Sequence, residues 1–143
     1  MAIRLDIGID FDGTIAEVTK DHSLGKPIEE ARDALKALKE WRHEGRDGKE
    51  YEFRLVLDSC RTSTRCHGTD HIKRHIAELT EWFKDNDIPM DKIEVNEKRS
   101  FVFRIDDRGI QIFPKKKTTW ADAMEDIYKD VDNFIDAMNN KVK

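Results

Sequence analysis

The sequence contains only two cysteines and no long apolar run. Cys60 and Cys66 lie close together and are too few for a disulfide framework, which favours reduced thiols and a cytoplasmic protein. The N-terminal residues MAIRLDIGID include no apolar stretch long enough for a signal peptide or a membrane span. Internal repeats, low-complexity segments and linkers are also missing. We therefore expect residues 1–143 to form a single soluble domain.

Acidic residues are in slight excess over basic ones. Charged residues make up 39% of the chain and hydrophobic ones 38%, and the formal net charge is -4. A negative chain is a poor candidate for a general nucleic-acid coat. Local basic residues could still attract a nucleotide or a nucleic-acid end, namely Arg61, Arg65, Arg108 and Lys115–Lys117. The polar composition predicts a modest core, and the protein could be a monomer or a homodimer.

Segments with strand and helix patterns alternate along the chain. Apolar residues at every second position predict a first strand over 3–9. Further strands are predicted at YEFRLVLDS (51–59), KIEVN (92–96), FVFRIDD (101–107) and IQIF (110–113). Helical periodicity predicts three helices. The first begins after Pro27, the second ends before Ile88, and the third begins at a cap formed by Thr118 or Thr119. The alternation predicts an α/β protein with a parallel sheet covered by helices on both faces.

Acids and phosphate-binding residue types follow the predicted strands. In parallel sheets, ligands bind beyond the carboxyl ends of the strands. Carboxylates that gather there repel one another unless a divalent cation lies among them, and oxygen ligands suit Mg²⁺. The residues at these ends are Asp10, Asp12, Ser59, Arg61, Asp106 and Asp107. Lys98 lies between the predicted strands at 92–96 and 101–107. They predict a magnesium site that holds a phosphoryl group.

The turn after the first strand has the residues that such chemistry needs. Asp10 and Asp12 are two positions apart, so one carboxylate could attack phosphorus while the other handles the proton of the leaving group. Gly13 permits a sharp exit from the strand, and Thr14 can hold the turn.

These motifs resemble those of the haloacid dehalogenase superfamily of phosphohydrolases, in its small members without a cap domain. The matching segments are DFDGT (10–14), GKPIEEARDALKAL (25–38), LVLDSCR (55–61), Lys98 and FRIDDRGIQI (103–112). They occur in the expected order and cover essentially the whole chain, which makes a strong signal. The resemblance implies a three-layer, Rossmann-like parallel sheet.

The resemblance also implies a role for each matched residue. Asp10 would be the nucleophile that forms an aspartyl-phosphate, and Asp12 would be the general acid and then the general base. The phosphoryl group would be held by Ser59, Lys98, Gly13, Thr14 and Arg61. Mg²⁺ would be bound by Asp10, the backbone carbonyl of Asp12, Asp106 and, through water, Asp107. The implied activity is Mg²⁺-dependent hydrolysis of a phosphomonoester on a small phosphometabolite, a nucleotide or a nucleic-acid end.

Two other interpretations of the same residues remain open. A receiver-like or non-catalytic signalling module could bind phosphate or a metal, with Asp58 as phosphoacceptor and Lys98 as the distal lysine. A zinc site could be formed from the potential ligands Cys60, Cys66, His67, His71 and His75.

The entrance to the predicted site would have to be built from loops, because no cap domain fits in the chain. We expect the loop at 17–26 and the segment at 61–71 to shape this entrance and to select the substrate. Arg65 and His67 in the second segment favour a leaving group that carries additional anionic or polar groups.

Overall fold

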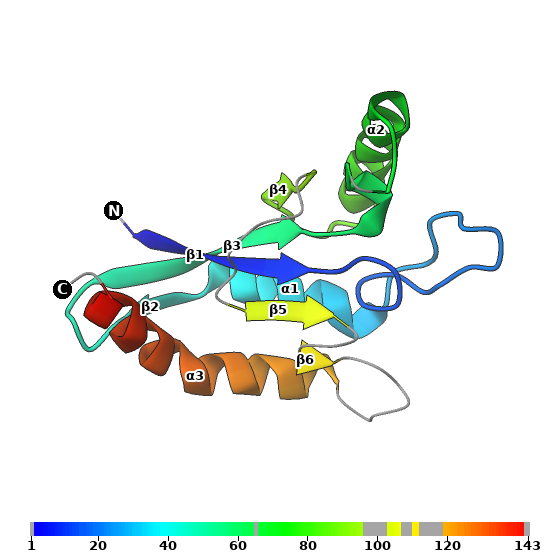
Figure 1. The fold of residues 1–143 in the computed structure, drawn as a ribbon. Coiled ribbons are helices and arrows are strands. Elements are labelled where there is room, and N and C mark those ends of the chain that lie inside the picture. Colours follow the sequence, from blue (N-terminus) through cyan, green and yellow to red (C-terminus); the bar gives the residue numbers. More distant parts are fainter. Residues whose placement is uncertain (1, 65, 96–102, 107–109, 112–118, 142–143) are drawn as a thin grey trace.

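The structure is a computed structural model that describes residues 2–64, 66–95, 103–106, 110–111 and 119–141. Strands and helices follow one another in the order shown in Figure 1. The elements are β1 (Ile3–Ile9), α1 (Glu29–Glu40), β2 (Arg42–Glu44), β3 (Glu50–Leu57), the 3-10 turn η1 (Cys60–Thr62), α2 (Thr69–Asp85), β4 (Lys92–Ile93), β5 (Phe103–Asp106), β6 (Ile110–Gln111) and α3 (Trp120–Lys141).

Five of the strands in the sheet run parallel, and their order is what positions the candidate site. The order is β2-β3-β1-β5-β6, with β4 paired to the carboxyl end of β3. β1 is central and lies parallel to both β3 and β5. The carboxyl ends of β1, β3 and β5 therefore meet at one edge of the sheet (Figure 1).

The short strand β2 departs from the predicted all-parallel sheet because it pairs antiparallel with β3. The polar residues HEGRDGKE (43–50) show no strand periodicity, and no strand was predicted there. The two strands form a hairpin through a tight turn, in which the Gly48 N–H donates to the Gly45 carbonyl at 2.9 Å and Gly48 has φ 77°. The Arg42 guanidinium also lies 3.0 Å from the Glu52 carboxylate across the pair. The local turn thus determines the direction of β2.

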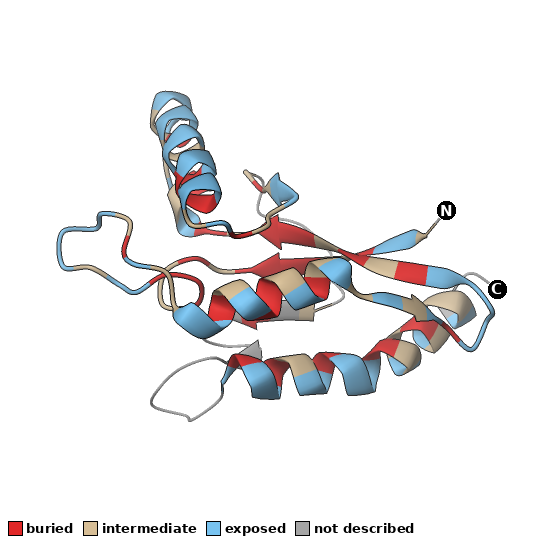
Figure 2. Cartoon of the chain, turned by 180° about the vertical axis from the view of Figure 1, so that it is seen from behind, coloured by how far each residue is buried: buried red, intermediate tan, exposed pale blue. Residues whose placement is uncertain are grey.

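The apolar core lies on one face of the sheet. Ile7 and Ile9 of β1 pair with Leu55 and Leu57 of β3, respectively. These four side chains are fully buried. The helices α1 and α3 turn their buried residues toward this face (Figure 2). In α3 the buried residues are Trp120, Ala123, Ile127, Val131 and Ile135. Full burial of an aliphatic side chain contributes about 1.5–3 kcal/mol, so these layers hold the strands in place.

The opposite face carries ion pairs at the amino-terminal half of the central strands. The Arg54 guanidinium binds both carboxylate oxygens of Asp6 at 2.8 and 2.7 Å, and Arg4 binds Glu52 at 3.1 Å. At this end of the sheet β1 is therefore buried on one face, which fits its alternation of apolar and polar residues, whereas Leu55, Val56 and Leu57 at the end of β3 are all buried.

The helix α2 packs beyond the carboxyl ends of the strands. Its Trp82 and Phe83 rings meet Phe11 edge-on, with centroids 4.8 and 6.0 Å away. The indole N–H of Trp82 also donates to the Gly25 carbonyl at 3.0 Å. These contacts hold α2 against both the turn after β1 and the loop at 17–26.

We predict that Gly25→Ala destabilises the protein by about 1–3 kcal/mol, because a methyl group there would lie 1.9 Å from the Glu17 carbonyl oxygen. Urea unfolding followed by tryptophan fluorescence measures the change. Gly68→Ala is the matched control, since a methyl group at Gly68 meets nothing within 4 Å. Equal losses in the two variants would contradict the steric explanation.

Candidate active site

Backbone hydrogen bonds join the strand ends at the site. The Asp58 N–H donates to the Ile9 carbonyl at 2.9 Å, and the Asp10 N–H donates to the Ile105 carbonyl at 3.0 Å. Asp10 therefore lies directly between the ends of β3 and β5. One of its carboxylate oxygens accepts from the Phe11 N–H at 2.9 Å, which orients the side chain at the start of the turn.

The turn after β1 is closed by its own backbone. The Phe11 carbonyl accepts from the N–H groups of Ile15 and Ala16 at 2.9 and 3.1 Å, and the Gly13 N–H donates to the Ala16 carbonyl at 2.7 Å. Gly13 has φ 79°, a conformation that costs glycine little and other residues more. The turn therefore depends on a glycine at this position.

Thr14 supports the turn from the inside. The residue is 1% exposed, and its carbonyl accepts from the indole N–H of Trp120 at 3.0 Å. Because Trp120 is the first residue of α3, the helix that covers the core also anchors the site.

Arg61 forms a bidentate ion pair with Asp12. Its Nε and Nη2 atoms donate to the two carboxylate oxygens of Asp12 at 2.8 and 2.9 Å. The same guanidinium donates to the carbonyls of His22 and Ser23 at 2.8 and 3.2 Å, and it lies 5.8 Å from the centre of the Phe11 ring. One side chain thus connects the end of β1, the loop at 17–26 and η1.

Ser59 holds the backbone of η1, from which the Arg61 side chain extends to Asp12. The residue is 5% exposed, and its hydroxyl oxygen accepts from the Arg61 N–H at 3.2 Å, which caps η1. Four predicted site residues, Asp10, Asp12, Ser59 and Arg61, therefore come together at the carboxyl edge of the sheet.

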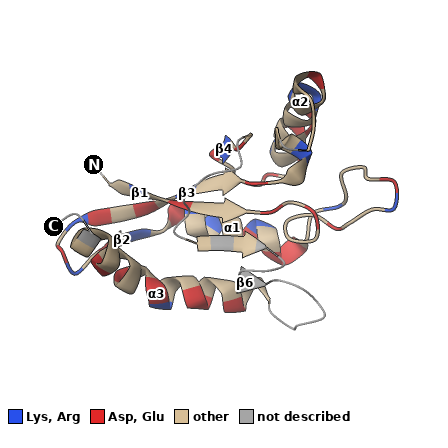
Figure 3. Cartoon of the chain, viewed as in Figure 1, with Lys and Arg blue, Asp and Glu red and all other residues tan. Residues whose placement is uncertain are grey.

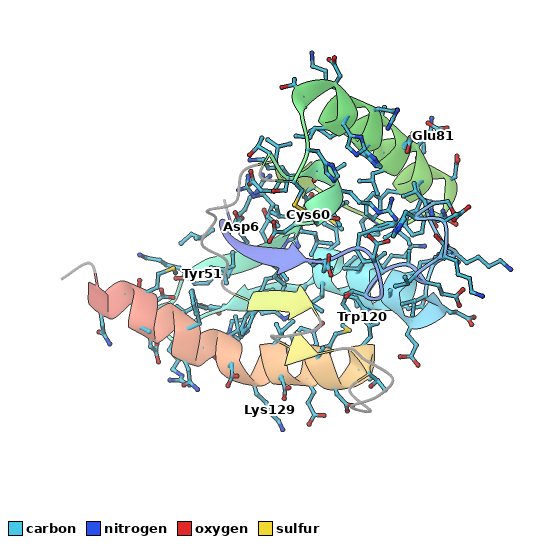
Figure 4. All side chains as sticks on the ribbon, turned by 45° about the vertical axis from the view of Figure 1, so that its right-hand side comes forward. Asp6, Tyr51, Cys60, Glu81, Trp120 and Lys129 are labelled. Atoms are coloured by element: carbon cyan, nitrogen blue, oxygen red, sulfur yellow. A yellow bond between two sulfur atoms is a disulfide. The ribbon has the colours of Figure 1, made fainter. Side chains whose placement is uncertain are left out.

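The prediction of free cysteine thiols is wrong, because Cys60 and Cys66 form a disulfide. The chain between the two cysteines folds back on itself, because the N–H groups of Cys66 and His67 both donate to the Ser63 carbonyl at 3.1 Å. The fold brings the two Cα atoms to 6.2 Å, within the range that a disulfide spans. Cys60 lies at the base of α2 (Figure 4). In the disulfide neither sulfur can serve as a thiolate ligand of zinc.

A cavity of about 380 Å³ opens beside Asp12. The two segments predicted to shape the entrance both border it. Its lining residues are Asp12, Val18, Thr19, His22, Cys60, Arg61, His67, His71 and His75. His22 was not among the predicted site residues, and its position within the loop at 17–26 is the one signal in the sequence that points to it.

Three histidines are gathered on one side of this cavity. The ring centroids of His67 and His71 are 4.0 Å apart, and those of His71 and His75 are 4.2 Å apart. Burial, and then the neighbouring imidazoles, lower the pKa of His71. Burial lowers the pKa of His75 as well, and Arg61 adds to this while Glu78 opposes it. Burial and the neighbouring positive groups therefore disfavour the charged forms of His71 and His75.

Several predicted residues lie outside the part of the chain that the structure describes. These are Lys98, Asp107, Arg65, Arg108 and Lys115–Lys117. The backbone of Asp106 ends β5 and pairs with Gln111. Within the described ranges, no group of three or more His, Cys, Asp or Glu side chains is arranged to hold a metal ion.

Comparisons with protein-family models, with curated proteins and with solved structures find no match to this chain. Among the helices that the structure describes, none has the length and apolar character to cross a membrane.

We predict that replacing both cysteines by serine lowers the free energy of unfolding by about 2 kcal/mol, because the disulfide closes a loop with a sequence separation of 6. Urea unfolding of the double variant and of the wild type measures the difference. Reduction of the wild type with dithiothreitol should cause the same loss and leave the variant unchanged. Identical unfolding curves with and without the reductant would rule out the disulfide in solution.

Proposed function

We propose that this protein is a Mg²⁺-dependent phosphomonoesterase that works through an aspartyl-phosphate on Asp10. The observation that carries the proposal is the meeting of Asp10 and Asp12 with Ser59 and Arg61 at the carboxyl edge of a mainly parallel sheet. The cavity beside Asp12 adds space for a substrate at this edge. Sites in α/β sheets are found at such edges.

Asp10 would act as the nucleophile. A carboxylate oxygen attacks phosphorus, the new oxygen–phosphorus bond forms, and the bond from phosphorus to the leaving oxygen breaks. Asp12 gives a proton to that leaving oxygen and then takes one from the water that hydrolyses the aspartyl-phosphate. The products are an alcohol and inorganic phosphate, and both carboxylates return to their starting state.

The oxygen atoms at the strand ends suit Mg²⁺. The Asp10 carboxylate, the Asp12 carbonyl and Asp106 are hard oxygen donors, and the hydrogen bond from Asp10 to Ile105 brings the ends of β1 and β5 together. When bound, Mg²⁺ would neutralise the charge on the phosphoryl oxygens. Ser59 would donate its hydroxyl to the same group, since it lies at the end of the adjacent strand.

The ion pair between Asp12 and Arg61 sets a condition for this reaction. Both carboxylate oxygens of Asp12 accept hydrogen bonds from the Arg61 guanidinium, so neither is open to a leaving group. Asp12 can act as the general acid only after Arg61 has moved away and the carboxylate has taken a proton from solvent. A phosphate group is the natural competitor for a guanidinium, so the substrate itself would draw Arg61 off the carboxylate.

The same ion pair favours a second candidate, a module that binds phosphate without turnover. If Arg61 never leaves Asp12, no proton reaches a leaving group, and the site would hold a phosphate or a metal in a receiver-like role. Hydrolysis assays separate the two candidates.

We predict that the wild type hydrolyses p-nitrophenyl phosphate with Mg²⁺ and loses this activity in excess EDTA. Asp10→Asn should lower kcat by at least about a thousandfold, because an amide does not attack phosphorus. Asp33→Asn on the exposed side of α1 is the matched control and should retain full activity. Mass spectrometry excludes deamidation of the variant. Substantial turnover by Asp10→Asn would eliminate Asp10 as nucleophile.

We also predict that Asp12→Asn slows hydrolysis in a way that depends on the leaving group. For an alkyl phosphate, kcat should fall about a hundredfold or more, because the departing alkoxide needs a proton. For p-nitrophenyl phosphate the loss in the first step should be smaller, because the phenolate leaves without one. Release of alcohol and of p-nitrophenol under single-turnover conditions measures the two rates. Equal losses would assign Asp12 a role other than acid catalysis.

A further inference from the structure

Much of the lining of the cavity beside Asp12 is apolar, but most of the polar side chains there carry N–H donors. Its lining includes four imidazoles and one guanidinium, from His22, His67, His71, His75 and Arg61. Among the described residues that line it, Asp12 is the single carboxylate, and Arg61 already binds that carboxylate with two hydrogen bonds. Each imidazole supplies at least one N–H donor, and the one carboxylate is engaged by Arg61, so this lining can accept an anion.

The amino-terminal end of α2 adds to this character. The helix has 17 residues and begins at Thr69, and its N-cap Gly68 offers no side-chain cap. His67 precedes the helix and His71 lies in its first turn, so these imidazoles stand where the helix dipole is positive. Asp70 in the same turn offsets part of the dipole, but it is exposed and does not line the cavity.

One ring nitrogen in this cluster has no hydrogen-bond partner among the described residues. The Nδ1 atom of His75 is buried, and its nearest carboxylate oxygen, on Glu78, is 3.9 Å away. An unpaired polar atom that is shielded from water costs free energy. A ligand oxygen in the cavity would remove this cost once the His75 ring turns Nδ1 toward it.

The reaction determines which part of a substrate reaches this cavity. The leaving oxygen must lie next to Asp12, and the cavity begins at Asp12, so the rest of the leaving group extends among the imidazoles. Resting on the proposed function, we propose that this cavity binds a second phosphate group, carried by the leaving group of a small bisphosphorylated substrate.

Arg61 gives the second phosphate a further effect. Its guanidinium lines the cavity and binds Asp12, so a phosphate placed there competes with the carboxylate for the same donors. Once Arg61 moves to the phosphate, the Asp12 carboxylate can take a proton from solvent and pass it to the leaving oxygen. A bisphosphate should therefore raise kcat as well as lower KM.

The overall charge argues for a small substrate. The chain has a net charge of -4, and acidic residues recur along α3 (Figure 3). A polyanion such as a nucleic-acid strand would be repelled by this field, whereas a small anion experiences mainly the local donors. The cavity volume of about 380 Å³ is also within the range of small-molecule sites.

Two alkyl esters with the same leaving chain test the proposal. We expect kcat/KM for 1,3-propanediol bisphosphate to exceed that for n-propyl phosphate at least about tenfold, well above the twofold that two equivalent ester groups give. The double variant His67→Phe with His71→Phe keeps the aromatic rings and removes their donors. In this variant the ratio of the two kcat/KM values should fall to about two, because kcat for the bisphosphate falls and its KM rises.

Lys73→Gln is the control for general electrostatics, because it removes a positive charge from an exposed position of α2 that does not line the cavity. Its ratio should equal that of the wild type. A wild-type ratio near two, or an unchanged ratio in the double histidine variant, overturns the proposal. Faster turnover of a 3'-phosphorylated dinucleotide than of the bisphosphate would assign the site to a nucleic-acid end and also contradict it.

Equilibrium binding keeps the inference separate from the proposed function. In the Asp10→Asn variant, titration calorimetry should show at least about tenfold tighter binding of the bisphosphate than of propyl phosphate. This preference should disappear when His67→Phe and His71→Phe are added. Tight, histidine-dependent binding without hydrolysis by the wild type would refute the phosphatase and retain the anion site. Hydrolysis by the wild type without tighter binding of the bisphosphate would retain the phosphatase and refute the anion site.

Discussion

The ion pair between Arg61 and Asp12 is the contact on which the candidate site depends. Arg61 follows β3 through η1, Asp12 follows β1, and the guanidinium also holds the carbonyls of two residues in the loop at 17–26. A contact between two planar groups with two hydrogen bonds fixes orientation as well as distance. One side chain therefore links the turn after β1, η1 and the loop. The Phe11 ring under the guanidinium connects this arrangement to Trp82 of α2.

Much of the sheet could be predicted from alternation and strand order, and the exceptions have local causes. The apolar residues at every second position of 3–9 identified β1. β2 was missed because three polar residues carry no periodicity. The signal for it was the Asp47-Gly48 pair, a frequent hairpin turn between two extended segments. The predicted cap of α3 is seen at Thr119, whose hydroxyl accepts from the Asp122 N–H at 3.2 Å.

The site was predictable where it follows from strand ends and unpredictable where it follows from loop geometry. Asp10, Asp12 and Ser59 come directly after strands, so the topology alone brings them together. The partner of Asp12 could not be read from spacing, because Arg61 reaches it through the path of η1. The disulfide was missed because cysteine number was used as a guide to redox state. Two cysteines six positions apart are bonded here since the Ser63 carbonyl folds the chain between them.

The contact that organises the site also opposes the chemistry that we assign to it. While Arg61 binds Asp12, both carboxylate oxygens are occupied as hydrogen-bond acceptors and neither can contact a leaving oxygen. A substrate with one phosphate would need Arg61 at the reacting group, and that shift would withdraw it from the carbonyls of the entrance loop. A second phosphate in the cavity would let Arg61 leave Asp12 and remain beside the loop, because the cavity lies between them. Proton donation by Asp12 is then tied to the presence of the correct leaving group. A site without a cap domain could in this way limit the hydrolysis of phosphate esters that do not fill its entrance.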